Sequence, residues 1–173
     1  MKRFALLIIL SFSFLFFSCD DEEIIEGCTD PVACNYDSNA TDLLLGSCNY
    51  PLESVLEFTY SDDLVTGLVG EDVISHVHIR NSSCEAVSIK ARKIFTSTDE
   101  YSAYFCFADV CFGSDVTVSP TTLILESFEE DDYFKGYFNS SVPGTYEVLY
   151  RFYLENNPDI YIEKVIVYEI SAS

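Results

Sequence analysis

The stretch "TYEVLYRFYLE", Thr145 to Glu155, carries the pattern that decides the fold of this chain. Every second side chain is apolar and falls on one face, namely Tyr146, Val148, Tyr150, Phe152 and Leu154. The opposite face carries three charged side chains beside two apolar ones, namely Glu147, Arg151, Glu155, Leu149 and Tyr153. Period-two alternation with one charged face is typical of a half-buried antiparallel strand.

Similar runs fill the chain from about residue 52 onward. They are rich in β-branched and aromatic residues and are separated by Gly, Pro, Asn-Ser and Asp-Asp signals. We expect strands at Val55–Tyr60, Val73–Arg80, Ala86–Phe95, Ala103–Phe107, Val116–Ser119, Thr122–Ser127, Tyr133–Asn139, Thr145–Glu155 and Ile160–Ile170. No segment after the N-terminal apolar run has the 3.6-residue apolar stripe of a helix. The sequence therefore predicts an all-β fold, an immunoglobulin-like antiparallel β-sandwich, with a closed barrel as the alternative.

The N-terminus has the organisation of a secretory signal. Lys2 and Arg3 precede an apolar run, Phe4 to Phe17, that is interrupted only by two serines. A membrane-spanning helix fits less well, because a span needs roughly 20 apolar residues. We therefore assign residues 1–18 to a signal peptide.

The signal ends in "FFSC", which resembles the lipobox of bacterial lipoproteins. That resemblance implies cleavage before Cys19 and acylation of Cys19, whose lipid would anchor the chain in a membrane. The next residues, "DDEE", resemble the surface-export signal of lipoproteins in the Bacteroidetes. The resemblance implies an outer-membrane lipoprotein that faces the cell surface. A plain signal peptide with an incidental cysteine is the alternative to the lipobox, and a periplasmic location is the alternative to surface exposure. The acids also suit a solvated tether, which is compatible with an export signal.

Charge and length limit the classes of function. A formal net charge of -20 repels phosphate backbones, so we expect no nucleic-acid partner. The aromatic share of 15% is too high for a disordered chain. We divide the chain into a signal peptide (1–18), an acidic tether (19–26), a cysteine-rich module (27–51) and a sandwich domain (52–173).

Seven cysteines in an exported chain are first of all disulfide candidates. With Cys19 assigned to lipid, six remain. Cys106 and Cys111 bracket "FADV" at the ends of two short strands, which favours a hairpin disulfide. A catalytic dithiol is the alternative, but it favours two intervening residues and a helix N-terminus.

Residues 27–51 contain "GCTD", "ACNYDSNAT" and "GSCNYP". These pieces resemble a short repeat that is common in exported Bacteroidetes proteins. The resemblance implies a Cys28–Cys48 disulfide, which leaves Cys34 and Cys84 as a third pair. Zinc binding is a further alternative for Cys28, Cys34 and Cys48. Their Cys-x5-Cys-x13-Cys spacing, however, lacks the closely spaced cysteine pairs of structural zinc sites.

The order "HVHIRNSS", "YFCFADVCFG", "VTVSP", "FKGYFN" and "IEKVIVYEI" also carries a resemblance, over residues 70 to 170. It is similar to a β-sandwich module of secreted and surface Bacteroidetes proteins, often found before a type IX secretion sorting domain. The middle of that module carries a Tyr-Phe-Cys-Trp…Cys-Tyr hairpin, and this chain departs from it with Phe107 in place of Trp and Phe112 in place of Tyr.

Other polar groups are weighed as ligands. Alternating oxygen donors suit calcium, so a weak calcium site is one interpretation of Asn35, Asp37, Asn39 and Asp42, with Asp30 upstream. Turn capping by these side chains is the leading interpretation, and we expect no cofactor. His76 and His78 lie two apart on one predicted strand face, and a metal there is the minor alternative. The acid run Glu126, Glu129, Glu130, Asp131 and Asp132 is interpreted as a solvated turn rather than a glycosidase pair.

We therefore expect a non-enzymatic, lipid-anchored envelope protein that acts in adhesion, envelope structure or partner binding. Its partner is an unidentified protein or glycan, and Tyr153 and Tyr161 are candidates for a binding face. The alternative is a glycan-binding or enzymatic accessory lipoprotein of a surface uptake complex.

Overall fold

The computed structural model describes residues 23–172, and in it the TYEVLYRFYLE stretch forms strand β12, Gly144–Leu154. Val148, Tyr150 and Phe152 are each at most 1% exposed, while the side chains between them are half-buried. On either side of β12 lie β13, Asn157–Ser171, and β6, Val87–Ile94, both antiparallel to it. The signal peptide, Cys19 and the first acids of the tether lie outside the described residues.

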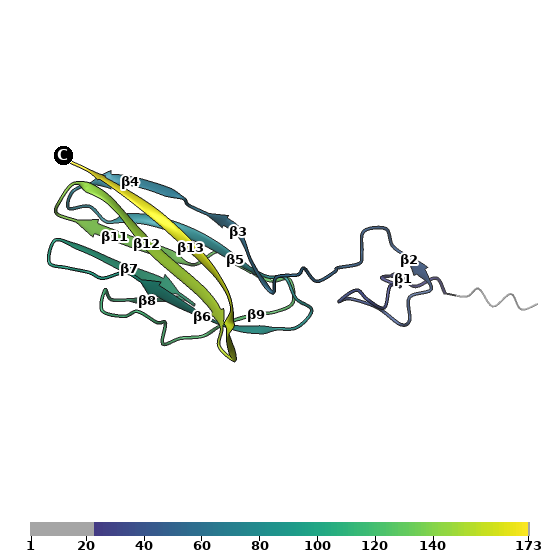
Figure 1. The fold of residues 1–173 in the computed structure, drawn as a ribbon. Coiled ribbons are helices and arrows are strands. Elements are labelled where there is room, and N and C mark those ends of the chain that lie inside the picture. The colour runs from purple at the N-terminus through teal and green to yellow at the C-terminus, as the bar shows by residue number, and fades with distance from the viewer. Residues whose placement is uncertain (1–22, 173) are drawn as a thin grey trace, which may run out of the picture.

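Two sheets face each other in the main body (Figure 1). The first contains β3 (Leu56–Ser61), β5 (Val73–Asn81), β7 (Tyr101–Phe107), β8 (Val110–Phe112), β10 (Glu130–Asp131) and β11 (Lys135–Ser140). The second runs in the order β4 (Leu64–Leu68), β13, β12, β6 and β9 (Leu123–Leu125). The described residues form no helix. The predicted all-β, immunoglobulin-like sandwich is confirmed.

Aromatic rings fill the space between the sheets. The ring of Phe134 lies 5.0 Å from that of Tyr150 and 4.8 Å from that of Phe152, in edge-to-face arrangements. Phe58 adds a further edge contact to Phe152, and Phe107 packs against Phe152 in a tilted arrangement. Burying each such side chain stabilises the fold by about 1.5–3 kcal/mol, so this cluster fixes how the sheets stack.

The first strand of the sandwich is divided between the sheets. β3 pairs with β5, and after Asp62 and Asp63 the chain continues as β4, which pairs in parallel with β13. The Asp62 carboxylate accepts a hydrogen bond from the His76 backbone N–H (2.8 Å), and the Asp63 carbonyl accepts one from Val167 (2.9 Å). Asp62 therefore binds the crossover to β5 of the first sheet, and Asp63 binds it to β13 of the second.

The expected strand Val116–Ser119 is wrong. This segment makes only an isolated bridge, Val118 to Arg92 of β6. The Ser119 hydroxyl accepts the hydrogen bond of the Ala91 N–H (3.1 Å), which a strand would satisfy with a backbone carbonyl. A side chain in that role interrupts the ladder of backbone hydrogen bonds.

Lys93 is the buried cation of the sandwich, 1% exposed. Its Nζ donates to the carbonyl oxygens of Ala103 and Ser114, so it links β6 to β7 across the core. Burial lowers the pKa of Lys93, and Asp115 opposes that effect.

The short module before the sandwich has little regular structure. β1, Glu26–Gly27, pairs in parallel with β2, Asp42–Leu43. Figure 1 shows it as a small lobe beside one end of the sandwich, joined by an extended linker. So small a unit has almost no core and depends on cross-links.

Gly136 of β11 lies where two buried hydroxyl groups approach the backbone. A Cβ at this position would lie 2.6 Å from the Tyr150 hydroxyl oxygen and 2.7 Å from Ser75 Oγ. Ser75 Oγ is 2.7 Å from the Tyr168 hydroxyl, whereas the Tyr150 hydroxyl has no hydrogen-bond partner among the described residues. Burial raises the pKa of Tyr150 well above its usual value.

Gly136→Ala is expected to lower the free energy of unfolding by about 1–3 kcal/mol, because the added methyl overpacks the core. Tyr150→Phe alone should cost less than about 1 kcal/mol, since its hydroxyl has no partner to lose. In the Tyr150→Phe background the Gly136→Ala loss should shrink, as measured by urea denaturation. An undiminished loss would contradict the proposed contact.

Candidate functional site

Three disulfides join the six cysteines of the described residues in pairs. Cys28 and Cys48 close the small module with Cα atoms 4.9 Å apart. Cys28 is 2% exposed, so this bond is the centre of the module. A loop of about 20 residues closed in this way is stabilised by roughly 3 kcal/mol in the loop-entropy estimate.

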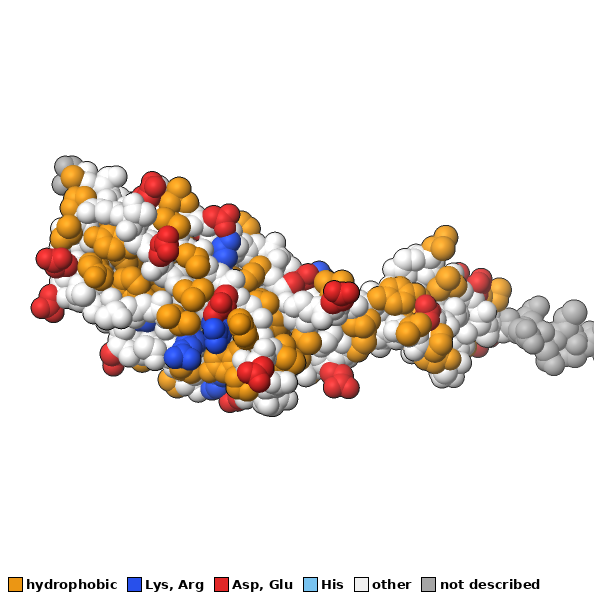
Figure 2. Space-filling model, in the orientation of Figure 1, with side chains coloured by type: hydrophobic (Ala, Val, Ile, Leu, Met, Phe, Trp, Pro, Cys, Tyr) orange, Lys and Arg blue, Asp and Glu red, His pale blue; other side chains and the backbone are white. Residues whose placement is uncertain are grey.

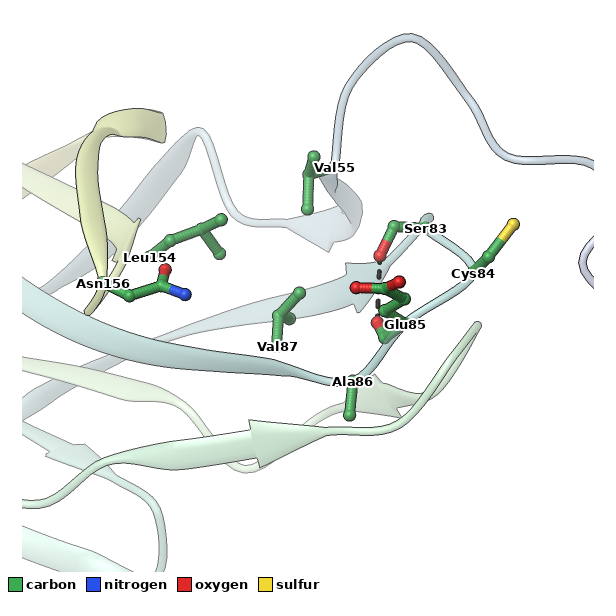
Figure 3. Close-up of a pocket in the computed structure, with 8 residues that line it drawn as sticks. All are labelled: Val55, Ser83, Cys84, Glu85, Ala86, Val87, Leu154 and Asn156. Carbon is green, nitrogen blue, oxygen red and sulfur yellow. Dashed lines mark hydrogen bonds between the residues drawn. The ribbon is translucent and has the colours of Figure 1, made fainter.

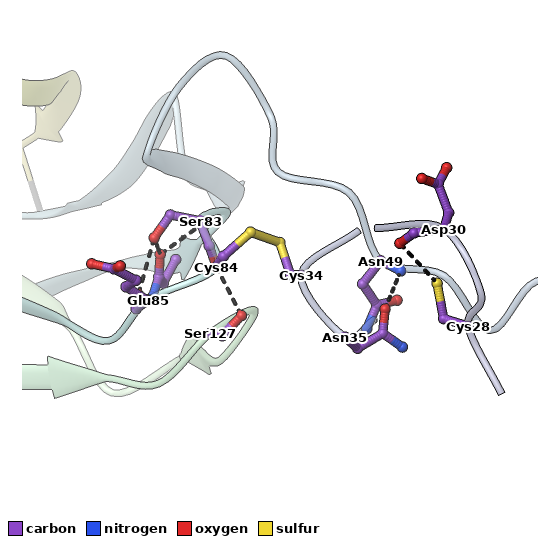
Figure 4. The surroundings of a disulfide bond; sticks show 10 residues. Cys28, Asp30, Cys34, Asn35, Asn49, Ser83, Cys84, Glu85 and Ser127 are labelled. Carbon is purple, nitrogen blue, oxygen red and sulfur yellow. Dashed lines mark hydrogen bonds between the residues drawn. A yellow bond between two sulfur atoms is a disulfide. The ribbon is translucent and has the colours of Figure 1, made fainter. Parts of the chain in front are cut away.

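The second disulfide, Cys34–Cys84, attaches the module to the loop between β5 and β6 (Figure 4). The backbone adds to this attachment. The N–H of Leu52 donates to the Ser82 carbonyl (3.0 Å), and the N–H of Ser82 donates to the Val55 carbonyl (2.8 Å). The linker is therefore bound to the same loop that carries Cys84.

Asn81 organises the loop that presents Cys84. It is fully buried, and its amide nitrogen donates to the carbonyl oxygens of Glu85 (2.7 Å), Leu125 (3.1 Å) and Glu126 (2.9 Å). Its Oδ1 accepts from the Ser83 N–H (3.0 Å). Sequence reasoning missed this role, for which "NSSC" at the end of a strand is the only local signal.

The third disulfide, Cys106–Cys111, joins residues directly opposite each other in the β7–β8 hairpin. Ala108 and Asp109 form the two-residue turn, with φ angles of 49° and 62°. Positive φ at both central residues is the geometry of a tight hairpin turn. The bond thus links two directly paired residues across a tight hairpin, which is the geometry of a structural cross-link.

The candidate calcium residues lie in the module, where their side chains bind its own backbone. Asp37 Oδ1 accepts from the Asn39 N–H (2.9 Å), Asp42 Oδ1 from Leu43 (2.9 Å), and Asn35 Oδ1 from Asn49 (2.7 Å). Asp30 accepts from Val32 and from the Tyr50 hydroxyl, and these hydrogen bonds lower the pKa of Asp30. The geometry favours the turn-capping interpretation over a calcium site.

His76 and His78 lie on the outer face of the first sheet. His76 Nδ1 is 3.6 Å from Asp62 Oδ2, and His78 Nδ1 is 3.4 Å from Glu130 Oε1. Each imidazole thus faces its own carboxylate. Within residues 23–172 no group of three His, Cys, Asp or Glu side chains is arranged to hold a metal ion.

The acid run differs from the expected solvated turn at two positions. Glu130 and Asp131 form β10, a short strand that pairs with Arg80 and Ile79 of β5. Asp131 is half-buried, and desolvation raises its pKa. Its position beside β5 was missed because so short a strand has no periodicity to detect.

A hollow of about 410 Å³ lies at the end of the sandwich beside Cys84 (Figure 3). It is lined by Val55, by the loop at 83–87 and by Leu154 and Asn156. Glu85 supplies the one carboxylate of this lining, while Cys84 is held in its disulfide. The lining suits a polar group or a chain segment; acid–base hydrolysis would need a second carboxylate.

In the described part of the chain, no helix has both the length and the apolarity to cross a membrane.

Replacing Cys34 and Cys84 together with Ser should free the module from the sandwich, because the closed loop loses about 4 kcal/mol of entropic stabilisation. We expect cleavage within residues 49–55 to become at least tenfold faster in limited proteolysis, followed by mass spectrometry. The matched Cys106→Ser, Cys111→Ser variant keeps the attachment and should resist cleavage there. Equal rates in both variants would contradict a stapling role.

Millimolar calcium should shift the unfolding midpoint of the protein by less than about 1 °C, because the Asn and Asp oxygens already accept backbone hydrogen bonds. Differential scanning calorimetry with and without a chelator measures this. A larger upward shift that disappears in Asp37→Asn would establish the calcium site instead.

No family model matches this chain, and no curated protein matches it. Among solved structures, it is similar to a PapD-like domain of human CEP192, with 14% identity and a TM-score of 0.43, over 78% of this chain and 97% of that one. It is also similar to the N-terminal domain of PorA, with 13% identity and a TM-score of 0.43, over 69% and 96%. A conjugative transposon lipoprotein from Bacteroides eggerthii shares 13% identity at a TM-score of 0.40, over 65% and 93%. At these scores the likenesses carry no conclusion about activity or partners.

Proposed function

We propose that this protein is a non-enzymatic lipoprotein of the bacterial cell envelope, anchored through Cys19 and exposed at the cell surface. The observation that carries the proposal is the N-terminal order of a basic pair, an apolar run, "FFSC" and "DDEE". Acyl chains on Cys19 would anchor it without a spanning helix. Three disulfides are consistent with an oxidising compartment.

The arrangement of the described residues supports a display role. The chain leaves the tether at Glu23 to Glu26, which are exposed, and passes through the stapled module before it reaches the sandwich (Figure 1). Cys34–Cys84 fixes the module to one end of the sandwich, so the outer faces of both sheets are left uncovered by it. We infer that the module is a spacer and that the sandwich meets the partner.

A second candidate function is glycan binding within a surface uptake complex. It is favoured by Tyr153 and Tyr161, which lie directly opposite each other on the outer face of β12 and β13. Tyr161 is 45% exposed, and the Arg151 guanidinium covers one face of its ring, 4.2 Å from the centroid, so a ligand can reach the remaining part of the ring. Binding without hydrolysis would fit both candidates, whereas hydrolysis would favour an enzymatic accessory role.

Mass spectrometry of the N-terminal peptide, combined with proteinase treatment of intact cells, tests anchoring and exposure. We expect an acylated Cys19 as the first residue and digestion of the protein on unbroken cells. Cys19→Ser should abolish acylation. Neutral replacement of residues 20–23 should keep the lipid but protect the protein from proteinase. An unmodified N-terminus or a protected wild-type protein would refute the proposal.

A further inference from the structure

The outer face of the second sheet carries a basic cluster, Lys90, Arg92 and Arg151. All three lie on adjacent strands, β6 and β12. The whole chain has only 9 Lys and Arg side chains against 29 Asp and Glu, so a cluster of three basic side chains is not expected from its composition. Figure 2 shows blue side chains grouped on this face of the sandwich, among orange apolar and red acidic ones.

The register places Arg92 directly opposite Arg151. Like charges at opposed positions of an antiparallel pair are destabilising. Glu163 of β13 relieves one of them, since Arg151 Nη2 lies 2.6 Å from Glu163 Oε1. Arg92 is exposed, and its guanidinium has no hydrogen bond or ion pair with another described residue. One guanidinium of the pair is therefore left for a ligand.

Lys90 completes the positive side of this face. Its Nζ donates to the Pro120 carbonyl (2.9 Å) and lies 3.5 Å from Glu155 Oε1. It is thus largely occupied, and it stands directly opposite Tyr153. The free anion-binding capacity is concentrated at Arg92.

A hollow of about 170 Å³ lies at the arginine pair, lined by Arg92, Arg151, Tyr153 and Pro158. A bulge in the pairing of β12 with β13 follows Tyr153 on the strand leading to the turn. The hollow is smaller than the roughly 300–1,000 Å³ of a typical ligand pocket. It therefore suits one unit of a longer ligand that continues over the sheet face.

Apolar surfaces flank this charge. The Arg151 guanidinium lies over the Tyr161 ring, 4.2 Å from its centroid, and Tyr153 is the residue opposite Tyr161 in the register of β12 and β13. A planar guanidinium binds a carboxylate with two parallel hydrogen bonds, and rings beside it pack against C–H groups. The site is built for a unit that carries both a carboxylate and an apolar face.

We propose that the face formed by Arg92, Arg151, Tyr153 and Pro158 binds a carboxylate-bearing sugar of an acidic polysaccharide. An acidic peptide fits less well, because the backbone of β12 is paired on both sides and β6 is bridged by Val118 beyond it. An extended peptide laid here gains no strand pairing. The proposal deepens the proposed function, since it names the partner class of the sandwich.

The acidic surface of the rest of the molecule determines how binding of a polyanion depends on salt. A net charge of -20 repels a polyanion at long range, and salt screens that repulsion. Binding therefore depends on the short-range contacts at Arg92 rather than on attraction by the whole surface. Raising the salt concentration should weaken it far less than it weakens binding to a basic protein.

Isothermal titration of the purified full chain tests the proposal with tetragalacturonate, tetramannuronate, their carboxyl-reduced neutral counterparts and tetraglutamate. We expect at least one uronate to bind, with at least tenfold loss in Arg92→Gln and in Tyr153→Ala. The matched control Arg80→Gln, on the other sheet, should retain full affinity. Arg92→Gln should also keep or raise the unfolding midpoint, because it removes the opposed charges, and this separates ligand binding from a structural role.

The proposal is overturned if neither uronate binds, if the neutral sugars bind equally well, or if tetraglutamate binds more tightly than both uronates. Equal losses in Arg80→Gln and Arg92→Gln would also overturn it. These titrations do not involve the lipid or the cell surface. Their failure therefore leaves the anchoring proposal standing, and an unacylated Cys19 would leave this site standing.

Discussion

The contact of Phe134 with Tyr150 and Phe152 is the interaction on which the sandwich depends. Phe134 directly precedes β11 of the first sheet, whereas Tyr150 and Phe152 belong to β12 of the second, and the edge-to-face packing of these rings joins the two layers. Because β12 alternates with period two, burying Tyr150 and Phe152 forces Arg151 and Tyr153 to the outside. The alternation of side chains along β12 therefore produces both the buried core and the outer basic face.

The same core explains the backbone constraints around it. Tyr150 reaches across to β11, where its hydroxyl leaves room only for Gly136. Lys93 lies between the sheets, and its ammonium group donates hydrogen bonds to two backbone carbonyl oxygens. Burying a cation is unfavourable unless its donors are used, and here the carbonyls of Ala103 and Ser114 accept from it. A tightly filled interior therefore fixes polar as well as apolar positions.

The alternating pattern predicted the long strands well, because β5, β12 and β13 each bury one face over many residues. It missed β4 and β10, which are short strands at sheet edges, and β8 was expected only as the second strand of the Cys106–Cys111 hairpin. Cys106–Cys111 was predicted from its spacing and Cys28–Cys48 from a resemblance, whereas Cys34–Cys84 remained only by elimination. The Arg92–Arg151 pair was not foreseen, because it depends on the register between strands far apart in sequence. Asn81 was missed for the same reason, since its partners Leu125 and Glu126 are remote.

The Cys34–Cys84 bond also changes how the chain transmits force. A pull on the N-terminal side of the molecule enters at Cys34 and crosses the disulfide directly into the loop before β6. Residues 35–83, including the linker, β3, β4 and β5, then lie outside the path of tension. Stretching would act first on β6, the strand that carries Arg92, while β3 and β5, two of the six strands of the first sheet, stay unloaded. The staple is thus a mechanical shortcut from the N-terminal segment to the basic face.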